Sequence, residues 1–324
     1  MIFFTIVVPV YNLENYLSRA LDSIFKQDFN IDLFEVIAID DGSSDSSLSI
    51  LIKYAQRYSN LRVYHQNNQG VSVARNLGLK YASGQYVTFL DGDDEFYLDS
   101  LSRAYSILKS HDIDVLYCYS FVNDGTKKLK QSHGTPPSVK NYEVCSIKQL
   151  ANFLNGGSVC GGFYKIKLLD KFKLKFPENI MNSEDAIFNY TLFSHNPSIM
   201  FSDIKLYMVH VRPGSASRSD SLTRAKHFSR NIDYIVDYME TEQMSEFQYQ
   251  YLSLALFQSF GCGVDMLLKV GVNELCKIKE ILHYKRLPAL KTPKNLLFKK
   301  FQFFLLNHSF SVYLLIFKLR NKFK

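Results

Sequence analysis

Carboxylates gather directly after an apolar stretch in YVTFLDGDDEF, where Asp91, Asp93 and Asp94 follow the run 86–90. Three like charges at the end of a buried strand repel one another unless a cation holds them together. Mg²⁺ and Mn²⁺ prefer carboxylate oxygens and bridge readily to diphosphates. Gly92 between the acids permits a sharp turn and the close approach of a ligand. The spacing therefore predicts a divalent-cation site, with a solvated acidic turn as the alternative.

Two further polar clusters carry groups suited to a nucleotide. IDDGSSDSS places Asp40 and Asp41 at the end of a predicted strand, where a carboxylate can accept from a nucleobase N–H. The alternative is a turn that caps the next helix, with Asp45 or a nearby serine as the N-cap. QGVSVARN contributes Arg75, which would pair with Asp41 or face a base or phosphate, unless it is a plain surface arginine.

Two later clusters carry groups for proton transfer and phosphate binding. In NSEDAIFNYTLF, Ser183 is a good N-cap, and Glu184 and Asp185 fall in the first helical turn. Acids there complement the helix dipole even without a catalytic role. In YMVHVRPGSAS a strand enters a loop rich in donors, and His210 and Arg212 lie on the same side of that strand. They would serve phosphates, with a solvated loop as the alternative.

The elements that position these clusters alternate between two periods over about the first 120 residues. The apolar run 3–10 and the segments VIAID (36–40), LRVYH (61–65), YVTFL (86–90) and VLYCYS (115–120) predict strands, and residues with helical spacing lie between them. This βαβαβαβ order is typical of a parallel sheet with helices on both faces. Ligands bind at the carboxyl ends of such strands, so PVYN, DDGS and DGDD should meet at one edge. No G-x-G-x-x-G follows the first strand, so the dinucleotide fingerprint is absent.

The composition bounds the protein class. The chain has 324 residues, 47% of them hydrophobic, and a net charge of +7, which suits one large domain or two ordinary ones. The five cysteines form no CxxC pair, so we expect no zinc, no disulfides and a reducing cytosol. The start MIFFTIVVPVYN lacks a basic region and is interpreted as a core strand. The sequence contains no run of about 18 apolar residues, so we predict no transmembrane helix.

Taken together, VVPVYN, IDDGSSDSS, GVSVARNLGL, YVTFLDGDDEF and SEDAIF resemble the family 2 glycosyltransferases in their order and separation. The resemblance extends through GGFYKIKLLDKFKLKFPENI and YMVHVRPGSAS. It implies an α/β GT-A fold over residues 1–217, a catalytic domain with a Rossmann-like, mostly parallel central sheet flanked by helices. We expect residues 218–324 to form a C-terminal helical region with a basic amphipathic tail.

The resemblance also implies roles for single residues. Nucleotide-sugar-binding residues would be Pro9, Tyr11, Asp40, Asp41, Arg75, Asp91, Gly92, His210 and Arg212. Asp93 would hold Mg²⁺ or Mn²⁺ with Asp94 in support, and Asp185 would be the catalytic base with Glu184 as its neighbour. His210 departs from the family pattern, because many relatives carry an arginine there.

The implied activity is inverting transfer of a hexose or N-acetylhexosamine from a nucleotide sugar, expected to be UDP-linked. The acceptor would be a glycan or lipid-linked glycan in bacterial capsule, O-antigen or exopolysaccharide synthesis. Asp185 would take a proton from the acceptor hydroxyl, while Asp93 shares its cation with the donor diphosphate. Two alternatives stay open: a sugar nucleotidyltransferase, although PVYNLENYL lacks a Gly-rich, Lys-bearing loop, and a catalytically degenerate membrane-associated scaffold.

The C-terminal tail, residues 285–324, contains ten Lys or Arg and no Asp or Glu. Mixed with leucines and aromatics, these charges predict amphipathic helices on an anionic membrane, with a core-packing helix pair as the alternative. We expect a polyprenyl-diphosphate-linked glycan acceptor and a cytoplasmic protein that is peripheral on the inner face of the cell membrane. No nucleic-acid-binding fold accompanies the basic tail, so nucleic acid is not expected as a partner.

Overall fold

The chain folds into two compact units. The computed structural model describes residues 1–123, 130–133, 158–180, 183–211, 221–241 and 243–287, together with Leu306 and Tyr313. The first unit comprises residues 1–145, 156–192 and 197–215, and the second comprises 146–155, 193–196 and 216–324. The domain boundary predicted after residue 217 falls within 212–220, outside the described residues, and stays a prediction.

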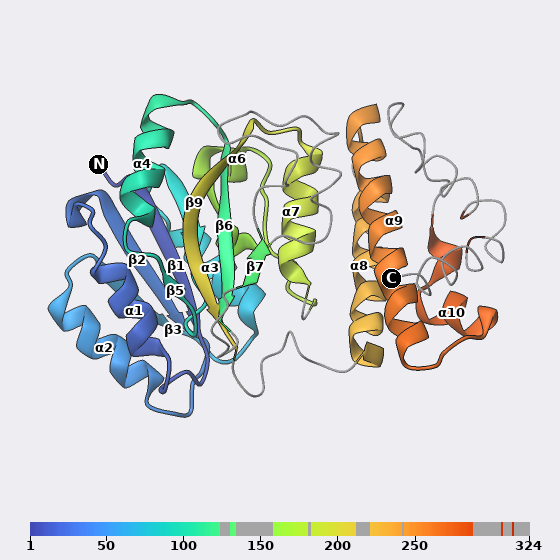
Figure 1. Ribbon diagram of the computed structural model, residues 1–324, viewed down its shortest axis with the longest axis horizontal. Coiled ribbons are helices and arrows are strands. Elements are labelled where there is room, and N and C mark those ends of the chain that lie inside the picture. Colours follow the sequence, from blue (N-terminus) through green and yellow to red (C-terminus); the bar gives the residue numbers. More distant parts are fainter. Residues whose placement is uncertain are drawn as a thin grey trace. The chain divides into compact units, whose positions relative to one another are not determined.

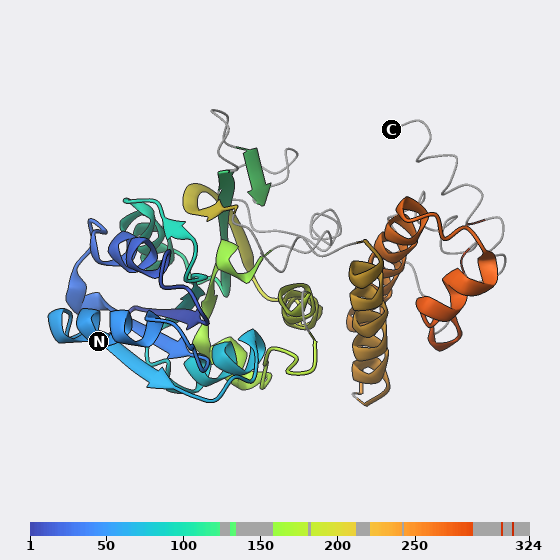
Figure 2. The same ribbon diagram turned by 90° about the horizontal axis from the view of Figure 1, so that it is seen from below.

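The first unit is a sheet with helices on both faces (Figures 1 and 2). Its strands are β1 (Phe4–Val10), β2 (Phe34–Asp40), β3 (Leu61–His65), β4 (Tyr86–Phe89), β5 (Glu95–Phe96), β6 (Val115–Asn123), β7 (Lys130–His133), β8 (Gly162–Lys165) and β9 (Ile199–His210). Its helices are α1 (Leu17–Phe25), α2 (Ser47–Arg57), α3 (Val71–Tyr81), α4 (Ser100–Ser110), α6 (Ile166–Lys171) and α7 (Glu184–Ser194), with short 3₁₀ turns η1 (Ile31–Leu33) and η2 (Val159–Gly161).

The strand order is β3-β2-β1-β4-β8-β6-β9-β5, and β7 pairs with β6. The pairs β1/β2, β1/β4, β2/β3 and β6/β9 are parallel, which confirms the predicted α/β class. One feature differs from a simple βαβ succession: β8 lies between β4 and β6 and runs antiparallel to both. A later segment of the chain therefore supplies the partner for β4.

The inner strands are apolar because both of their faces are covered. Every residue of β1, β2 and β4 is buried, as expected for strands that carry helices on each side. Helix α3 packs closely on one face: a Cβ added at Gly78 would lie 2.3 Å from a Val7 methyl carbon. Only a glycine at this point allows α3 to lie so near β1.

The second unit is helical where it is described, as predicted. It contains α8 (Ser221–Thr241), α9 (Glu246–Lys269), α10 (Leu275–Ile281) and η4 (Tyr284–Arg286), and α8 packs along α9. A capping box between Ser245 and Gln248 starts α9. By length and composition α9 could cross a membrane, which the sequence did not predict, but 67% of its most apolar window is buried inside the protein. Such burial is typical of the core helix of a globular unit.

Residues 285–287 of the basic tail are described, at the end of η4 and just after it, and beyond them the structure describes only Leu306 and Tyr313 of the tail. The side chains of Leu306 and Tyr313 are both buried. The Tyr284 hydroxyl donates to the Leu306 carbonyl at 2.6 Å, and the ring of Tyr313 meets Phe257 and Phe260 of α9 edge-on or tilted. At these two points the tail contributes to the core of the second unit.

Replacing Gly78 with alanine should lower the free energy of unfolding by about 1–3 kcal/mol, because the new methyl group overlaps the buried Val7 side chain. Chemical denaturation measures the loss. In a double-mutant cycle, Val7→Ala should cost less in the Gly78→Ala background than in the wild type. Additive losses would show that α3 tolerates the methyl group without touching Val7.

Candidate active site

The buried guanidinium of Arg75 joins three carboxylates from distant parts of the chain. The residue is 2% exposed. Its Nη2 donates to Asp91 Oδ1 at 2.8 Å, and its Nη1 donates to Glu184 Oε1 at 2.9 Å and to Asp185 Oδ1 at 2.7 Å. Burial alone would lower the pKa of Arg75, but the three carboxylates raise it well above its usual value. These four residues, here called the Arg75 cluster, were all predicted site residues.

The partners of Arg75 differ from one sequence expectation. Pairing with Asp41 was one alternative, yet the Asp41 oxygens accept from Gln66 Nε2 at 2.7 Å and from the N–H groups of Gln69 and Gly70 at 2.9 and 2.8 Å. Gly70 directly precedes α3, so Asp41 satisfies backbone donors at the start of the helix that carries Arg75. The physical reason is proximity: those donors follow the neighbouring strand β3.

One face of the Arg75 guanidinium packs against an aromatic ring. The guanidinium carbon lies 5.3 Å from the centre of Phe176, which stacks on Phe188 at 4.3 Å. The Asn76 side chain holds this ring in place, because its amide donates to the Phe176 carbonyl at 3.0 Å and its Oδ1 accepts from the Phe176 N–H at 2.8 Å. Arg75 is therefore held by the Phe176 ring as well as by its three carboxylate partners.

Asp185 accepts hydrogen bonds on both carboxylate oxygens. Oδ1 faces Arg75, whereas Oδ2 accepts from the Ser158 hydroxyl at 3.1 Å and from the Val159 N–H at 3.2 Å. Burial raises the pKa of Asp185 to about 7, and the charge of Glu184 adds to this while Arg75 opposes it. A carboxylate that gains a proton near neutral pH is well suited to act as a general base.

Two of the three acids of DGDD, Asp91 and Asp94, point in different directions. Asp91 belongs to the Arg75 cluster, while Asp94 is buried and its Oδ1 accepts from the His210 N–H at 2.8 Å. Burial raises the pKa of Asp94 to about 9, and the charges of Asp91 and Asp93 add to the shift. The Asp93 carbonyl accepts from Arg19 at 2.6 Å.

Gly92 is needed for close packing within the chain. A Cβ at this position would lie 2.8 Å from a Leu13 methyl carbon and 3.4 Å from the Pro9 carbonyl oxygen. The turn after β4 thus lies directly against the segment after β1. The predicted close approach of a ligand to Gly92 stays a prediction.

His210 ends β9 next to the DGDD turn, because β9 pairs with β5. Its Nε2 lies 2.9 Å from Glu95 Oε1, and Glu95 is 4.0 Å from Arg19. The imidazole is thus held and oriented by a carboxylate. Arg212, the other predicted phosphate contact, lies outside the described residues.

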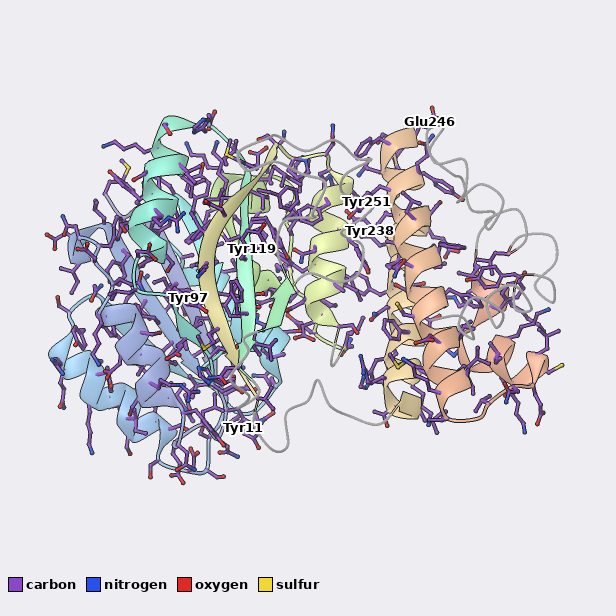
Figure 3. The ribbon with its side chains drawn as sticks, viewed as in Figure 1. Tyr11, Tyr97, Tyr119, Tyr238, Glu246 and Tyr251 are labelled. Atoms are coloured by element: carbon purple, nitrogen blue, oxygen red, sulfur yellow. The ribbon has the colours of Figure 1, made fainter. Side chains whose placement is uncertain are left out.

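The residues predicted to bind the nucleoside differ in their exposure. Pro9 is buried within β1, whereas Tyr11 is 49% exposed just beyond the end of this strand, at the lower edge of the sheet in Figure 3. Asp40 is fully buried, and its Oδ2 accepts from His65 Nδ1 at 2.7 Å. Tyr11 therefore remains exposed at the edge, whereas Asp41 is 3% exposed and Asp40 in this conformation has no surface that a ligand can touch.

The described residues include no group of three or more His, Cys, Asp or Glu side chains placed to hold a metal ion. A cation at DGDD would need further oxygen ligands from a bound molecule, as Mg²⁺ commonly takes from phosphates. The donor chemistry fits this, because Asp91, Asp93 and Asp94 place three carboxyl groups in one turn, and burial together with the charges of Asp91 and Asp93 raises the pKa of Asp94. The site is compatible with a divalent cation that arrives together with its ligand.

Residues 5–172 match the family model described as Glycosyl transferase family 2, more than half of the chain. The chain belongs to glycosyl transferase family 2. Among curated relatives, the uncharacterized glycosyltransferase EpsJ of Bacillus subtilis (strain 168) is 29% identical over 65% of this chain and 62% of its own length. The poly(ribitol-phosphate) beta-N-acetylglucosaminyltransferase TarS of Staphylococcus aureus (strain Mu50 / ATCC 700699) is 31% identical over 66% of this chain and 36% of its own length. The chain thus spans less than two thirds of these family 2 relatives.

Solved structures confirm the predicted GT-A fold. A fragment of S. aureus TarS in complex with UDP-GlcNAc superimposes with a TM-score of 0.73 at 24% identity, covering 89% of this chain and 82% of the fragment. The mannosyltransferase PcManGT from Pyrobaculum calidifontis, in complex with GDP-Man and Mn²⁺, has a TM-score of 0.56 at 16% identity, covering 98% and 86%. At these identities the likeness establishes the fold of the family 2 chain and nothing finer.

Sequence reasoning missed the residues that hold the site in shape, among them Ser158, Asn76 and Phe176. Ser158 stands in an apolar and glycine-rich stretch, and nothing in its spacing links it to an acid 27 positions later. Asn76 directly follows Arg75, and this adjacency was the one available signal. A polar side chain next to a buried arginine, within an apolar helix face, indicates that it has a partner of its own.

Asp94→Asn should stabilise the protein at pH 8 by more than about 1 kcal/mol in EDTA, since each unit of pKa shift is worth about 1.4 kcal/mol. The folded-state pKa of about 9 lies above the ordinary value of 3.8, so the folded wild type keeps a proton that the unfolded chain has lost. Its stability therefore falls as the pH rises from about 4 towards 9. Asparagine keeps the acceptor for His210 without a charge.

Denaturant titrations at pH 4.5 and pH 8 measure this effect. The advantage of Asp94→Asn should shrink towards pH 4.5, and Asp170→Asn, an exposed control, should change the free energy of unfolding by less than about 0.5 kcal/mol at either pH. An equal advantage at both values of pH, or none, would contradict a buried and largely protonated Asp94.

Proposed function

We propose that this chain transfers a hexose or N-acetylhexosamine from a UDP-sugar to a hydroxyl group of a bacterial cell-surface glycan, with inversion at the anomeric carbon. The Arg75 cluster carries the proposal, because it joins Asp91 after β4 to Asp185 at the start of α7. It brings a nucleotide-facing acid and a proton acceptor with a raised pKa to one place. The name of TarS and its complexes with UDP-GlcNAc and UDP support the donor class.

Asp185 acts as the general base. The acceptor hydroxyl gives its proton to Asp185 as its oxygen attacks C1 of the sugar, on the face opposite the departing diphosphate. The raised pKa of Asp185 makes it basic enough to accept this proton near neutral pH. Arg75 keeps the carboxylate in position and shares its charge among Asp91, Glu184 and Asp185. A single displacement with one base inverts the anomeric configuration.

Asp93, supported by Asp94, would hold Mg²⁺ or Mn²⁺ together with the donor diphosphate. When bound, the cation supplies positive charge for the leaving group as the C1–O bond breaks. Asp94 has a further task in the chain itself, since it ties the turn to the His210 N–H at 2.8 Å. Tyr11 and Asp41 would receive the nucleobase at the neighbouring edge, and Asp40 would act there only through His65.

The acceptor is proposed to be a polyprenyl-diphosphate-linked glycan at the inner face of the cell membrane, in capsule, O-antigen, exopolysaccharide or teichoic acid synthesis. Two relatives that point to teichoic acid are the poly(ribitol-phosphate) beta-glucosyltransferase of Bacillus spizizenii and the minor teichoic acid biosynthesis protein GgaB of Bacillus subtilis. The basic tail supports a peripheral, cytoplasmic location, because Lys and Arg near an anionic leaflet each contribute about 1 kcal/mol. The buried Leu306 and Tyr313 leave the charged positions of the tail as the part to test.

The donor is identified by incubating the protein with UDP-, GDP- and dTDP-sugars in Mn²⁺, Mg²⁺ or EDTA. Slow release of UDP from one sugar should occur only with the metals and fall at least about 100-fold in Asp93→Ala and in Asp185→Asn. Calorimetry should show UDP binding lost in EDTA and in Asp93→Ala, but retained in Asp185→Asn. The exposed control Asp170→Ala should match the wild type. No binding of any nucleotide sugar would favour the scaffold alternative.

The membrane proposal is tested with a charge variant, because deleting the tail would also remove Leu306 and Tyr313 from the core. Changing Lys318, Arg320, Lys322 and Lys324 to glutamine should weaken sedimentation with phosphatidylglycerol vesicles at least about ten-fold, since four favourable charges are lost. The control variant changes the lysines at positions 26, 53, 80 and 109 to glutamine. Equal binding by the wild type and the tail variant would rule out an electrostatic anchor in these four residues.

A further inference from the structure

Ser158 contacts the proposed base from the side opposite Arg75. Its hydroxyl lies 3.1 Å from Asp185 Oδ2, and the next N–H in the chain, that of Val159, lies 3.2 Å from the same oxygen. Oδ1 of Asp185 receives Arg75 at 2.7 Å. A carboxylate oxygen has two lone pairs, so Oδ2 is filled by these two donors, while Oδ1 keeps one lone pair for a further donor.

The direction of the Ser158 hydroxyl follows from its other contacts. Its oxygen accepts from the Cys160 N–H at 3.2 Å as the N-cap of η2, so the hydroxyl proton is directed to Asp185. The Ser158 carbonyl accepts from the Tyr117 hydroxyl at 2.9 Å, and Tyr117 is a buried residue of β6. Main chain and side chain of Ser158 are therefore both fixed before any ligand binds.

We propose that Ser158 is a positioning residue for proton transfer: with the Val159 N–H it occupies Asp185 Oδ2, so that Oδ1 is the atom that takes the proton. This inference rests on the proposed function. In the step, the acceptor O–H proton moves to Asp185 Oδ1 as the acceptor oxygen bonds to sugar C1. The C1–O bond to the diphosphate breaks, and its electron pair leaves with the nucleoside diphosphate.

The hydroxyl also affects how readily Asp185 gains a proton. The titratable and charged groups that face Asp185 are Arg75 of α3, Glu184 of α7, Asp91 after β4, Cys160 of η2, Tyr117 of β6 and Tyr164 of β8, and Tyr207 of β9 faces Ser158 and Cys160. Removing the neutral Ser158 hydroxyl leaves all of these charges in place. A donor to the carboxylate is lost, so the charged form is less favoured and the pKa of Asp185 should rise.

The test compares Ser158→Ala, Ser158→Cys and Ser158→Thr in the 324-residue chain by UDP-sugar turnover with Mn²⁺ between pH 5.5 and 9. In Ser158→Ala, kcat should fall about ten-fold with an unchanged KM for the donor, and the acid limb of the profile should move to higher pH. Threonine keeps the hydroxyl and should restore both values. Cysteine, a weak donor of similar size, should be intermediate.

A matched control separates positioning from folding. Asn30 caps η1 through its side chain, which accepts from the Asp32 N–H at 2.9 Å, as Ser158 caps η2. Asn30→Ala should lower the melting temperature slightly and leave the pH profile unchanged. A wild-type profile in Ser158→Ala, or a loss of activity that tracks melting temperature and is not restored by threonine, would overturn the positioning role.

A second readout does not depend on turnover. NMR titration of ¹³Cγ-aspartate, with Asp185→Asn used for assignment, should show the Asp185 carboxyl titrating at higher pH in Ser158→Ala than in the wild type. An unchanged titration would overturn the hydrogen bond on which the inference rests. A further outcome is that the wild type turns over no nucleotide sugar while Asp185 still titrates at higher pH in Ser158→Ala. In that case the proposed function fails, but the hydrogen bond from Ser158 to Asp185 Oδ2 is supported.

Discussion

Three carboxylates surround the guanidinium of Arg75, which is withdrawn almost completely from water. A buried charge that loses its partners costs several kcal/mol, so the segments that carry Asp91, Glu184 and Asp185 cannot move away independently. Helix α3, the turn after β4 and the start of α7 are thereby bound to one point. Phe176 completes the enclosure beneath the guanidinium.

Helix α3 is itself fixed at both ends, and this gives Arg75 its position. Asp41 accepts from backbone donors just before the first turn, and Gly78 brings the last turns against Val7 of β1. Asp41, which its sequence position predicts as a nucleotide contact, therefore also has a structural role at the start of α3. The motif GVSVARNLGL combines chemistry in Arg75 with geometry in Gly78, and the two depend on each other.

Much of the first unit is predictable because its physics is local. Runs buried on both faces give β1, β2 and β4, and the rule that ligands bind where parallel strands end explains why the polar clusters meet. The direction of each side chain at that edge was not predictable. Asp91, Asp93 and Asp94 are equivalent in the sequence, yet one pairs with Arg75 and another turns inward to the His210 N–H.

The unpredicted parts depend on contacts between distant segments. Strand β8 has no periodicity that marks it as the partner of β4, and Ser158 bears no charge to suggest that it contacts an acid. The preference of Arg75 for Glu184 and Asp185 over Asp41 likewise follows from packing across more than 100 residues. Local propensity carries no information about such distances.

The place of β8 in the sheet has a consequence for the order in which the chain is made. Strand β4 pairs with β1 on one side, but its other edge is covered only by residues 162–165, some 75 positions later. Arg75 lacks two of its three carboxylate partners for longer still, because Glu184 and Asp185 follow it by 109 and 110 residues. During synthesis the N-terminal part therefore emerges with an open strand edge and an incompletely paired arginine, the kind of intermediate that chaperones protect from aggregation.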